Sequence, residues 1–110
     1  MDIELKMIRN TLIIRLQGEF DLVNAENIRS LIDEKMQEKQ INNLILNLNK
    51  VSFVDSSGLG VILGRYKKVK AKNGQMYIVG AQPVVKKILT LSGINKLIPL
   101  FSNEREVLKV

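Results

Sequence analysis

The chain has 110 residues, 45% of them hydrophobic, and a formal net charge of +6, which fits one globular domain. It contains no cysteine and no histidine, so disulfides, thiolate chemistry and a histidine-based catalytic triad are excluded. The sequence shows neither a secretory leader nor an apolar run of about 18 residues. We therefore expect a cytoplasmic protein without a membrane partner.

The first twenty residues predict a β-hairpin followed by a loop. Polar and apolar residues alternate over 3–7, which indicates a strand. A tight turn at 9–10 leads into a second strand over 11–16, antiparallel to the first. The stretch 18–21, Gly-Glu-Phe-Asp, interrupts the alternation and is expected to form a loop.

A helix is predicted to begin at Asn24, a good N-cap residue. Val23 before the cap and Ile28 inside the helix are spaced as a hydrophobic staple. Apolar residues at helical spacing continue the pattern, and the helix is expected to end near 39–40.

The middle of the chain predicts a strand, a helix and a second strand. Residues 43–48 are apolar on both faces, which is typical of a central strand, and 51–54 extend or follow it. A helix over 56–72 should end at Gly74 in the left-handed cap position. With a strand over 76–79, this order implies a right-handed parallel crossover.

The last third predicts a helix, a strand and a short final helix. Proline and glycine at the two ends of 83–93 match their preferred helix positions. A short strand is expected over 97–101, and Asn103 with Glu106 forms a candidate cap for the final helix. The whole chain, 1–110, therefore predicts one α/β domain with a mixed sheet of four to five strands and about four helices.

Lysines are densest at 67–72, on the predicted central helix. No aromatic residues interleave with them to stack on bases, so a solvated helix face is favoured over a nucleic-acid patch.

The most informative stretch is 54–64, where a strand meets two serines at the start of a helix. Asp55, Ser56 and Ser57 are all good N-caps, but capping accounts for only one of the hydroxyls. A phosphoserine is favourable there, because free N–H groups and the helix dipole face the anion.

An ideal helical wheel divides this helix into two faces. The predicted core face holds Leu59, Ile62, Leu63, Tyr66 and Val69, and the opposite side holds Ser57, Gly60, Val61, Gly64 and Lys68. Each of the two glycines costs about 1 kcal/mol relative to alanine. Their presence indicates close approach of a partner or close packing within the domain.

The same stretch does not predict catalysis. Neither the G-x-S-x-G elbow of hydrolases nor the phosphate-binding G-x-x-x-x-G-K-[ST] pattern is present. We expect no catalytic residues, no cofactor and no metal.

The motif over 53–67 closely resembles the signature of the STAS-domain anti-sigma factor antagonists, reading Phe-Val-Asp-Ser-Ser-Gly-Leu-Gly-Val-Ile-Leu-Gly-Arg-Tyr-Lys. The segment 18–21 resembles the loop after the family's second strand, 45–48 the strand before the motif, and 83–93 the later helix. The resemblance covers nearly the whole chain and is nearest to the antagonists of the anti-sigma F factor of sporulation.

This resemblance implies a STAS domain that works as a partner switch and has no enzymatic activity. The unphosphorylated form would bind an anti-sigma factor, which is also a serine kinase binding ATP or ADP, and release sigma F. The kinase would inactivate the protein by phosphorylation, and a PP2C-type phosphatase would restore it. No direct contact with nucleic acid is expected.

The resemblance assigns phosphorylation to Ser56, whereas the ideal wheel makes Ser57 the more exposed serine. The expected partner-binding residues are Asp21, Asp55, Ser57, Gly58, Leu59, Gly60, Val61 and Gly64. Two alternatives stay open: the same switch acting on another sigma factor, such as one for general stress, and a basic nucleic-acid-binding domain with salt-sensitive affinity.

Overall fold

The computed structural model describes residues 1–109, and the predicted α/β fold is confirmed. Five strands form one sheet in the order β1-β2-β3-β4-β5, with β1 antiparallel to β2 and every other pair parallel. The elements are β1 (Asp2–Ile8), β2 (Thr11–Phe20), α1 (Leu22–Met36), β3 (Asn43–Val54), α2 (Ser56–Ala71), β4 (Met76–Val79), α3 (Pro83–Ser92), the 3₁₀ turn η1 (Ile94–Lys96), β5 (Leu100–Phe101) and α4 (Glu104–Leu108).

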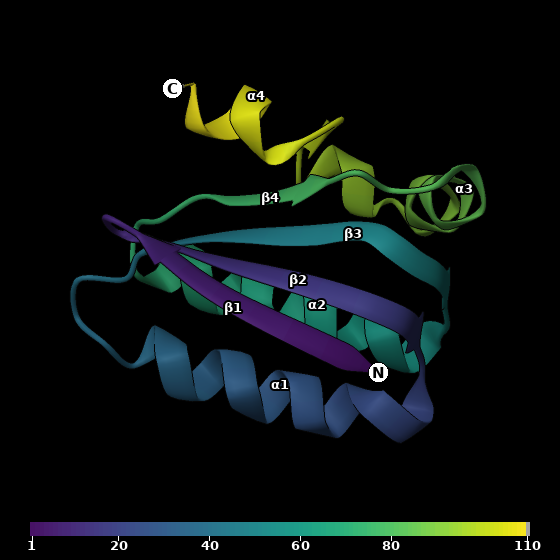
Figure 1. Ribbon diagram of the computed structural model, residues 1–110, viewed down its shortest axis with the longest axis horizontal. Helices are drawn as coiled ribbons and strands as arrows, with labels where there is room; N and C mark the ends of the chain where they lie inside the picture. The colour runs from purple at the N-terminus through teal and green to yellow at the C-terminus, as the bar shows by residue number, and fades with distance from the viewer. Residues whose placement is uncertain (110) are drawn as a thin grey trace.

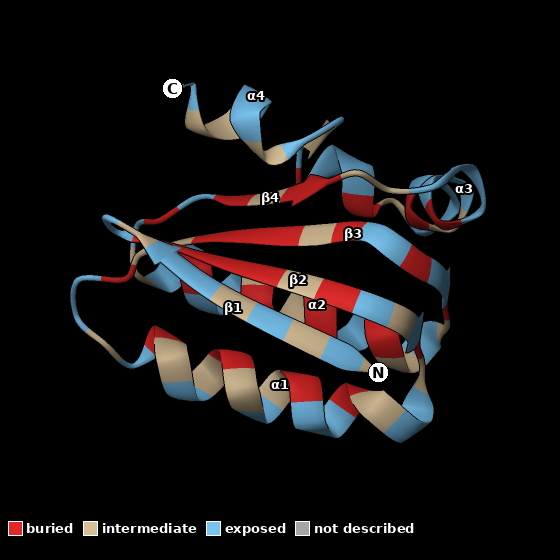
Figure 2. Ribbon diagram, viewed as in Figure 1, coloured by how far each residue is buried: buried red, intermediate tan, exposed pale blue. Residues whose placement is uncertain are grey.

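Helices cover the two faces of the sheet unequally. The larger core joins one face of the sheet to α1, α2 and α3, through buried residues such as Leu46, Ile28 and Leu89. On the other face, Ile13 and Ile45 belong to a small core to which α4 contributes. The buried residues follow β2 and β3, the strands at the centre (Figure 2). Both strands end at the same end of the sheet, where α1 and α2 begin (Figure 1).

The expected loop at 18–21 is wrong, because β2 continues to Phe20. Phe20 still pairs with Val54 of β3, and the register shifts between Gly18 and Glu19. Gly18 takes a φ of 124°, which a side chain would strain. An irregular strand and a loop look alike in this sequence, because the irregularity also interrupts the alternation.

The first helix begins earlier than predicted. Its N-cap is Asp21, whose side chain accepts the backbone N–H of Asn24. Asn24 instead lies in the first turn, and its amide donates to the carbonyl of Glu19. The predicted hydrophobic staple depends on a cap at Asn24 and is therefore wrong as well, and Val23 is 86% exposed.

The same helix ends at Met36, short of the expected 39–40. The ammonium of Lys72, at the end of α2, donates to the carbonyls of Met36, Glu38 and Ile41. A cation from another helix therefore satisfies carbonyls at and beyond this terminus.

The left-handed residue after α2 is Asn73, with φ of 60°, and not Gly74. A Cβ on Gly74 would lie 1.8 Å from the carbonyl oxygen of Asn42, so close packing accounts for this glycine. The last strand is also shorter than predicted, because η1 and its cap Leu97 precede it.

Candidate functional site

The candidate site lies where the turns before α1 and α2 meet. Asp55 joins the two: its Oδ1 accepts the N–H of Gly58 at 3.0 Å, and its Oδ2 accepts the N–H of Leu22 at 3.0 Å. The backbone N–H of Asp55 donates to the carbonyl of Phe20. The cap of α2 is thus Asp55, and a single carboxylate fixes two helix N-termini side by side.

Asp21 lies beside this junction, as expected for a residue near the serines. Its carboxylate accepts both the N–H and the side-chain amide of Asn24. Asp21 therefore shapes the start of α1, and its neighbour Leu22 is the residue that bonds to Asp55.

The two serines differ in exposure, in the order opposite to the ideal wheel. Ser56 is exposed, and Ser57 is half-buried. Ser57 begins the row continued by Val61 and Arg65, and Arg65 pairs with Asp33 of α1. The neighbouring helix covers that side, which a wheel drawn from one helix cannot show.

The same packing buries two of the predicted partner-binding residues. Val61 is only 8% exposed, although the wheel placed it on the outer side. Gly58 is buried, and a Cβ there would lie 2.5 Å from the carbonyl oxygen of Phe20. Gly58 therefore permits close approach of β2 to α2 within the domain, while Leu59 is half-buried on the other flank.

Gly60 and Gly64 have open space around them. A Cβ built on either meets no atom within 4 Å, apart from the helix's own backbone and adjacent residues. Internal close packing, one of the two explanations left open by the sequence, therefore does not apply to these glycines. The outer ridge of α2 is flat from Ser56 to Gly64.

Three exposed apolar side chains near the serines were missed by the sequence reasoning. Leu22 and Val23 are 74% and 86% exposed, and Phe53 is 44% exposed. Val23 was misread because the helix start was placed at Asn24. Alternation along a strand predicts that Phe53, two residues after the buried Val51, faces the core. The pattern therefore gives no sign of its exposure.

Beyond the junction, an ion-pair cluster holds α1 against α2. Arg65 Nε lies 2.9 Å from Asp33 Oδ1, and Asp33 also pairs with Arg29 and Lys68. Arg65 Nη1 is buried without a hydrogen-bond partner among the described residues. Burial lowers the pKa of the Arg65 guanidinium, and the charge of Asp33 opposes this shift.

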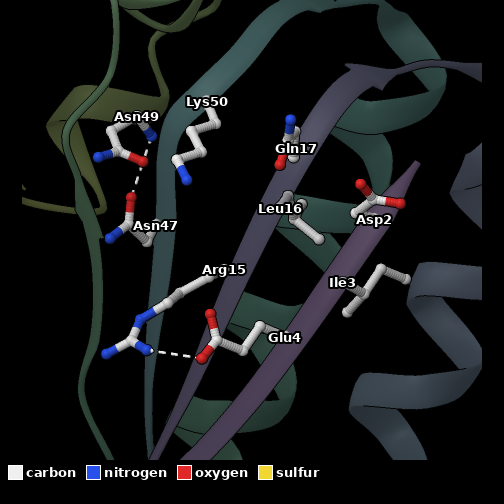
Figure 3. Close-up of a pocket in the computed structure, with 9 residues that line it drawn as sticks. All are labelled: Asp2, Ile3, Glu4, Arg15, Leu16, Gln17, Asn47, Asn49 and Lys50. Atoms are coloured by element: carbon white, nitrogen blue, oxygen red, sulfur yellow. Dashed lines mark hydrogen bonds and ion pairs between the residues drawn. The ribbon is translucent and has the colours of Figure 1, made fainter.

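A hollow with a volume of about 350 Å³ lies on the face of the sheet opposite α1 and α2 (Figure 3). Some of its polar groups are engaged with one another: Arg15 pairs with Glu4, and Asn47 accepts the N–H of Asn49. Arg15 also forms two hydrogen bonds of 2.8 Å to Glu104 of α4. These contacts fasten α4 to the sheet and present no catalytic group.

Two classes of site are absent from residues 1–109. No three His, Cys, Asp or Glu side chains are grouped in a way that could hold a metal ion. None of the helices there is both long enough and apolar enough to span a bilayer.

Comparison with known proteins identifies the family. The family model for the STAS domain matches residues 2–107. An anti-sigma F factor antagonist from Paenibacillus polymyxa is 41% identical over 104 residues, covering 94% of this chain and 89% of that protein.

Two solved structures show the same fold. The anti-sigma factor antagonist SpoIIAA in its unphosphorylated form has a TM-score of 0.87 and 32% identity, covering 98% of this chain and 94% of that one. The Bacillus cell fate determinant SpoIIAA in its phosphorylated form has a TM-score of 0.79 and 31% identity, covering 98% and 97%. With the junction at Asp55 and Ser56, these matches confirm the resemblance, and the chain belongs to the STAS-domain family of anti-sigma factor antagonists.

Proposed function

We propose that this protein is an anti-anti-sigma factor without enzymatic activity, controlled by phosphorylation of Ser56. The unphosphorylated form binds an anti-sigma factor that is also an ATP-dependent serine kinase, and binding releases a sigma factor. A PP2C-type phosphatase reverses the modification. Relatedness to an anti-sigma F factor antagonist favours sigma F, and hence sporulation, over a general-stress sigma factor.

The observation that carries this proposal is the setting of Ser56. Its side chain is exposed at the first position of α2, Asp55 already caps the helix, and Leu22 and Val23 lie across the junction. Exposed apolar side chains beside an open helix ridge are features of protein–protein docking surfaces. A related protein is known in a phosphorylated form, which supports phosphorylation here.

The loss of binding on phosphorylation follows from the position that the phosphate would take. A phosphate on Ser56 adds about −1.5 to −2 charges at pH 7 beside the Asp55 carboxylate. In the complex, that dianion would lie within an interface formed by Leu22, Val23, Phe53 and the ridge at Gly60 and Gly64. Desolvating an unpaired charge is costly, and each tenfold loss of affinity needs only about 1.4 kcal/mol.

We assign a structural role to the buried residues of the junction. We assign Gly58 and Val61 to packing α2 against its neighbours, and Asp55 to positioning both helix starts. Leu59 and Ser57, both half-buried, lie at the margins of the docking surface.

Phosphopeptide mapping after incubation with the cognate kinase and ATP tests the site. We expect one phosphate, on Ser56, in the native chain and in Ser57→Ala, and none in Ser56→Ala. Phosphate on Ser57 would contradict the assignment.

Calorimetry with the anti-sigma factor tests the switch. Ser56→Ala should bind like the native protein and resist inactivation, whereas Ser56→Asp should bind at least about tenfold more weakly. Ser30→Asp, at an exposed serine in the middle of α1, introduces the same charge and should bind normally. Equal affinities of the two Asp variants would contradict the proposal that a negative charge at Ser56 weakens binding. The identity of the sigma factor that is released in the native cell distinguishes control of sporulation from control of the general stress response.

A further inference from the structure

The positive charge of this protein is concentrated in one part of the chain. Between Ser56 and Asn103 the sequence contains no Asp or Glu. The same stretch carries eight positive residues: Arg65, Lys67, Lys68, Lys70, Lys72, Lys86, Lys87 and Lys96. This stretch, which contains α2, α3 and η1, therefore has a formal charge of +8, and the rest of the chain has −2.

The cations of α2 are partly used within the fold, whereas those of α3 and η1 are not. Arg65 and Lys68 pair with Asp33, and Lys72 donates to three carbonyls at and beyond the end of α1. The exposed lysines of α3 and η1 make no ion pair within residues 1–109. Glu106 lines the same shallow pocket as Lys86, but the Glu106 carboxylate accepts the N–H of Ser102.

Large aliphatic side chains are also exposed on α3 and next to η1. Val84 is 59% exposed, Leu91 is 79% exposed and Leu97 is 48% exposed. Val84, Lys87 and Leu91 are spaced i, i+3 and i+7, so they share one face of α3. The opposite face is buried, and Figure 2 shows α3 as a mostly exposed coil with a buried side. Lys86 projects from the flank of α3, toward Glu106. Lys96 and Leu97 are exposed at η1, which packs against α3. We call the exposed set Val84, Lys86, Lys87, Leu91, Lys96 and Leu97 the lysine–leucine surface.

The composition of this surface favours a lipid partner over a macromolecular one. Protein interfaces are enriched in aromatic residues and arginine and depleted in lysine, and single-stranded nucleic acids bind through aromatic stacking. None of the six residues is aromatic or an arginine. Lysine beside leucine on an exposed helix face is instead typical of peripheral contact with anionic bilayers.

We propose that the lysine–leucine surface docks the protein on an anionic lipid bilayer. Lys86, Lys87 and Lys96 contact the lipid phosphates, and Leu91, with Val84 and Leu97 beside it, enters the boundary of the acyl chains. The lack of a spanning segment is the reason that the sequence predicts no membrane partner. Peripheral docking needs only this exposed surface, and it is independent of the phosphorylation of Ser56.

Sedimentation with lipid vesicles at low salt tests the proposal. The native protein should bind vesicles that contain phosphatidylglycerol and should not bind pure phosphatidylcholine. Each lysine near an anionic surface contributes about fivefold to partitioning, so Lys86→Glu/Lys87→Glu should weaken binding by at least about 25-fold. The control Lys6→Glu/Lys39→Glu makes the same charge change at exposed lysines elsewhere and should lose much less.

A fluorescence experiment tests insertion separately. The chain has no tryptophan, so Leu91→Trp places a single reporter on the surface. Its emission should shift to the blue with phosphatidylglycerol vesicles and stay unchanged with phosphatidylcholine. Absence of sedimentation at low salt, an equal loss in the control variant, or no blue shift would each overturn the proposal. So would binding to duplex RNA or to an acidic protein without binding to the anionic vesicles.

Discussion

At the scale of single residues, two glycines two positions apart in α2 have opposite surroundings. A Cβ at Gly58 would lie 2.5 Å from a backbone oxygen and 2.9 Å from Val54 Cγ1, whereas a Cβ at Gly60 meets nothing within 4 Å. We predict that Gly58→Ala destabilises the fold by about 1–3 kcal/mol through overpacking. Gly60→Ala should stabilise it by up to about 1 kcal/mol, because alanine is the better helix former.

Urea unfolding of the two variants measures both effects, and calorimetry with the anti-sigma factor adds a functional readout. If partners approach the ridge closely, Gly60→Ala should be more stable than the native protein and yet bind more weakly. Unchanged binding by a stabilised Gly60→Ala would remove Gly60 from the docking surface.

At the scale of elements, the pairing of α1 with α2 depends on Asp33 and Arg65, whose side chains are 15% and 8% exposed. Asp33→Asn leaves the buried Arg65 charge without its main partner, and we predict a loss of about 3 kcal/mol of unfolding free energy. The double variant Asp33→Leu/Arg65→Leu should recover much of that loss, because it removes both charges. Denaturant unfolding measures each variant, and additive losses in the double variant would contradict the pairing.

The attachment of α4 predicts a dependence of stability on pH. Hydrogen bonds from Arg15 lower the pKa of Glu104, with a smaller contribution from Asn47. Because this folded-state pKa lies below the unfolded value, the interaction stabilises the fold at neutral pH and is lost as the pH falls through the folded-state pKa. Glu104→Gln should therefore cost about 1 kcal/mol at neutral pH.

Urea midpoints at neutral pH and at about pH 3 check this prediction, since carboxylates protonate between them. The difference between Glu104→Gln and the native protein should shrink on acidification. Glu34→Gln, at an exposed residue with no ion pair among residues 1–109, is the matched control and should show little difference at either pH. A difference for Glu104→Gln that persisted in acid would exclude the ion pair as its cause.

At the scale of the whole molecule, the sequence was sufficient for the order of the elements and insufficient for their mutual packing. Periodicity, together with cap, proline and glycine positions, predicted all five strands, the four helices and the strand–serine–helix junction. The exposure of Ser57 and Val61 was misjudged because it depends on Arg65 meeting Asp33, a residue 32 positions earlier. The cap at Asp21 was missed because Asn24 is an equally good cap by residue type.

The packing around Ser56 finally predicts that the molecule switches its binding and not its fold. Ser56 is exposed, Asp55 remains available as the cap, and a phosphate at a helix N-terminus is stabilised by about 0.3–1 kcal/mol. Repulsion from Asp55 opposes that gain, so phosphorylation should change the unfolding free energy by less than about 1 kcal/mol. Affinity for the anti-sigma factor should meanwhile fall at least about tenfold. Urea unfolding and circular dichroism of both forms measure this; a phosphorylated form destabilised by more than about 2 kcal/mol would mean that loss of structure, and not charge at the interface, ends binding.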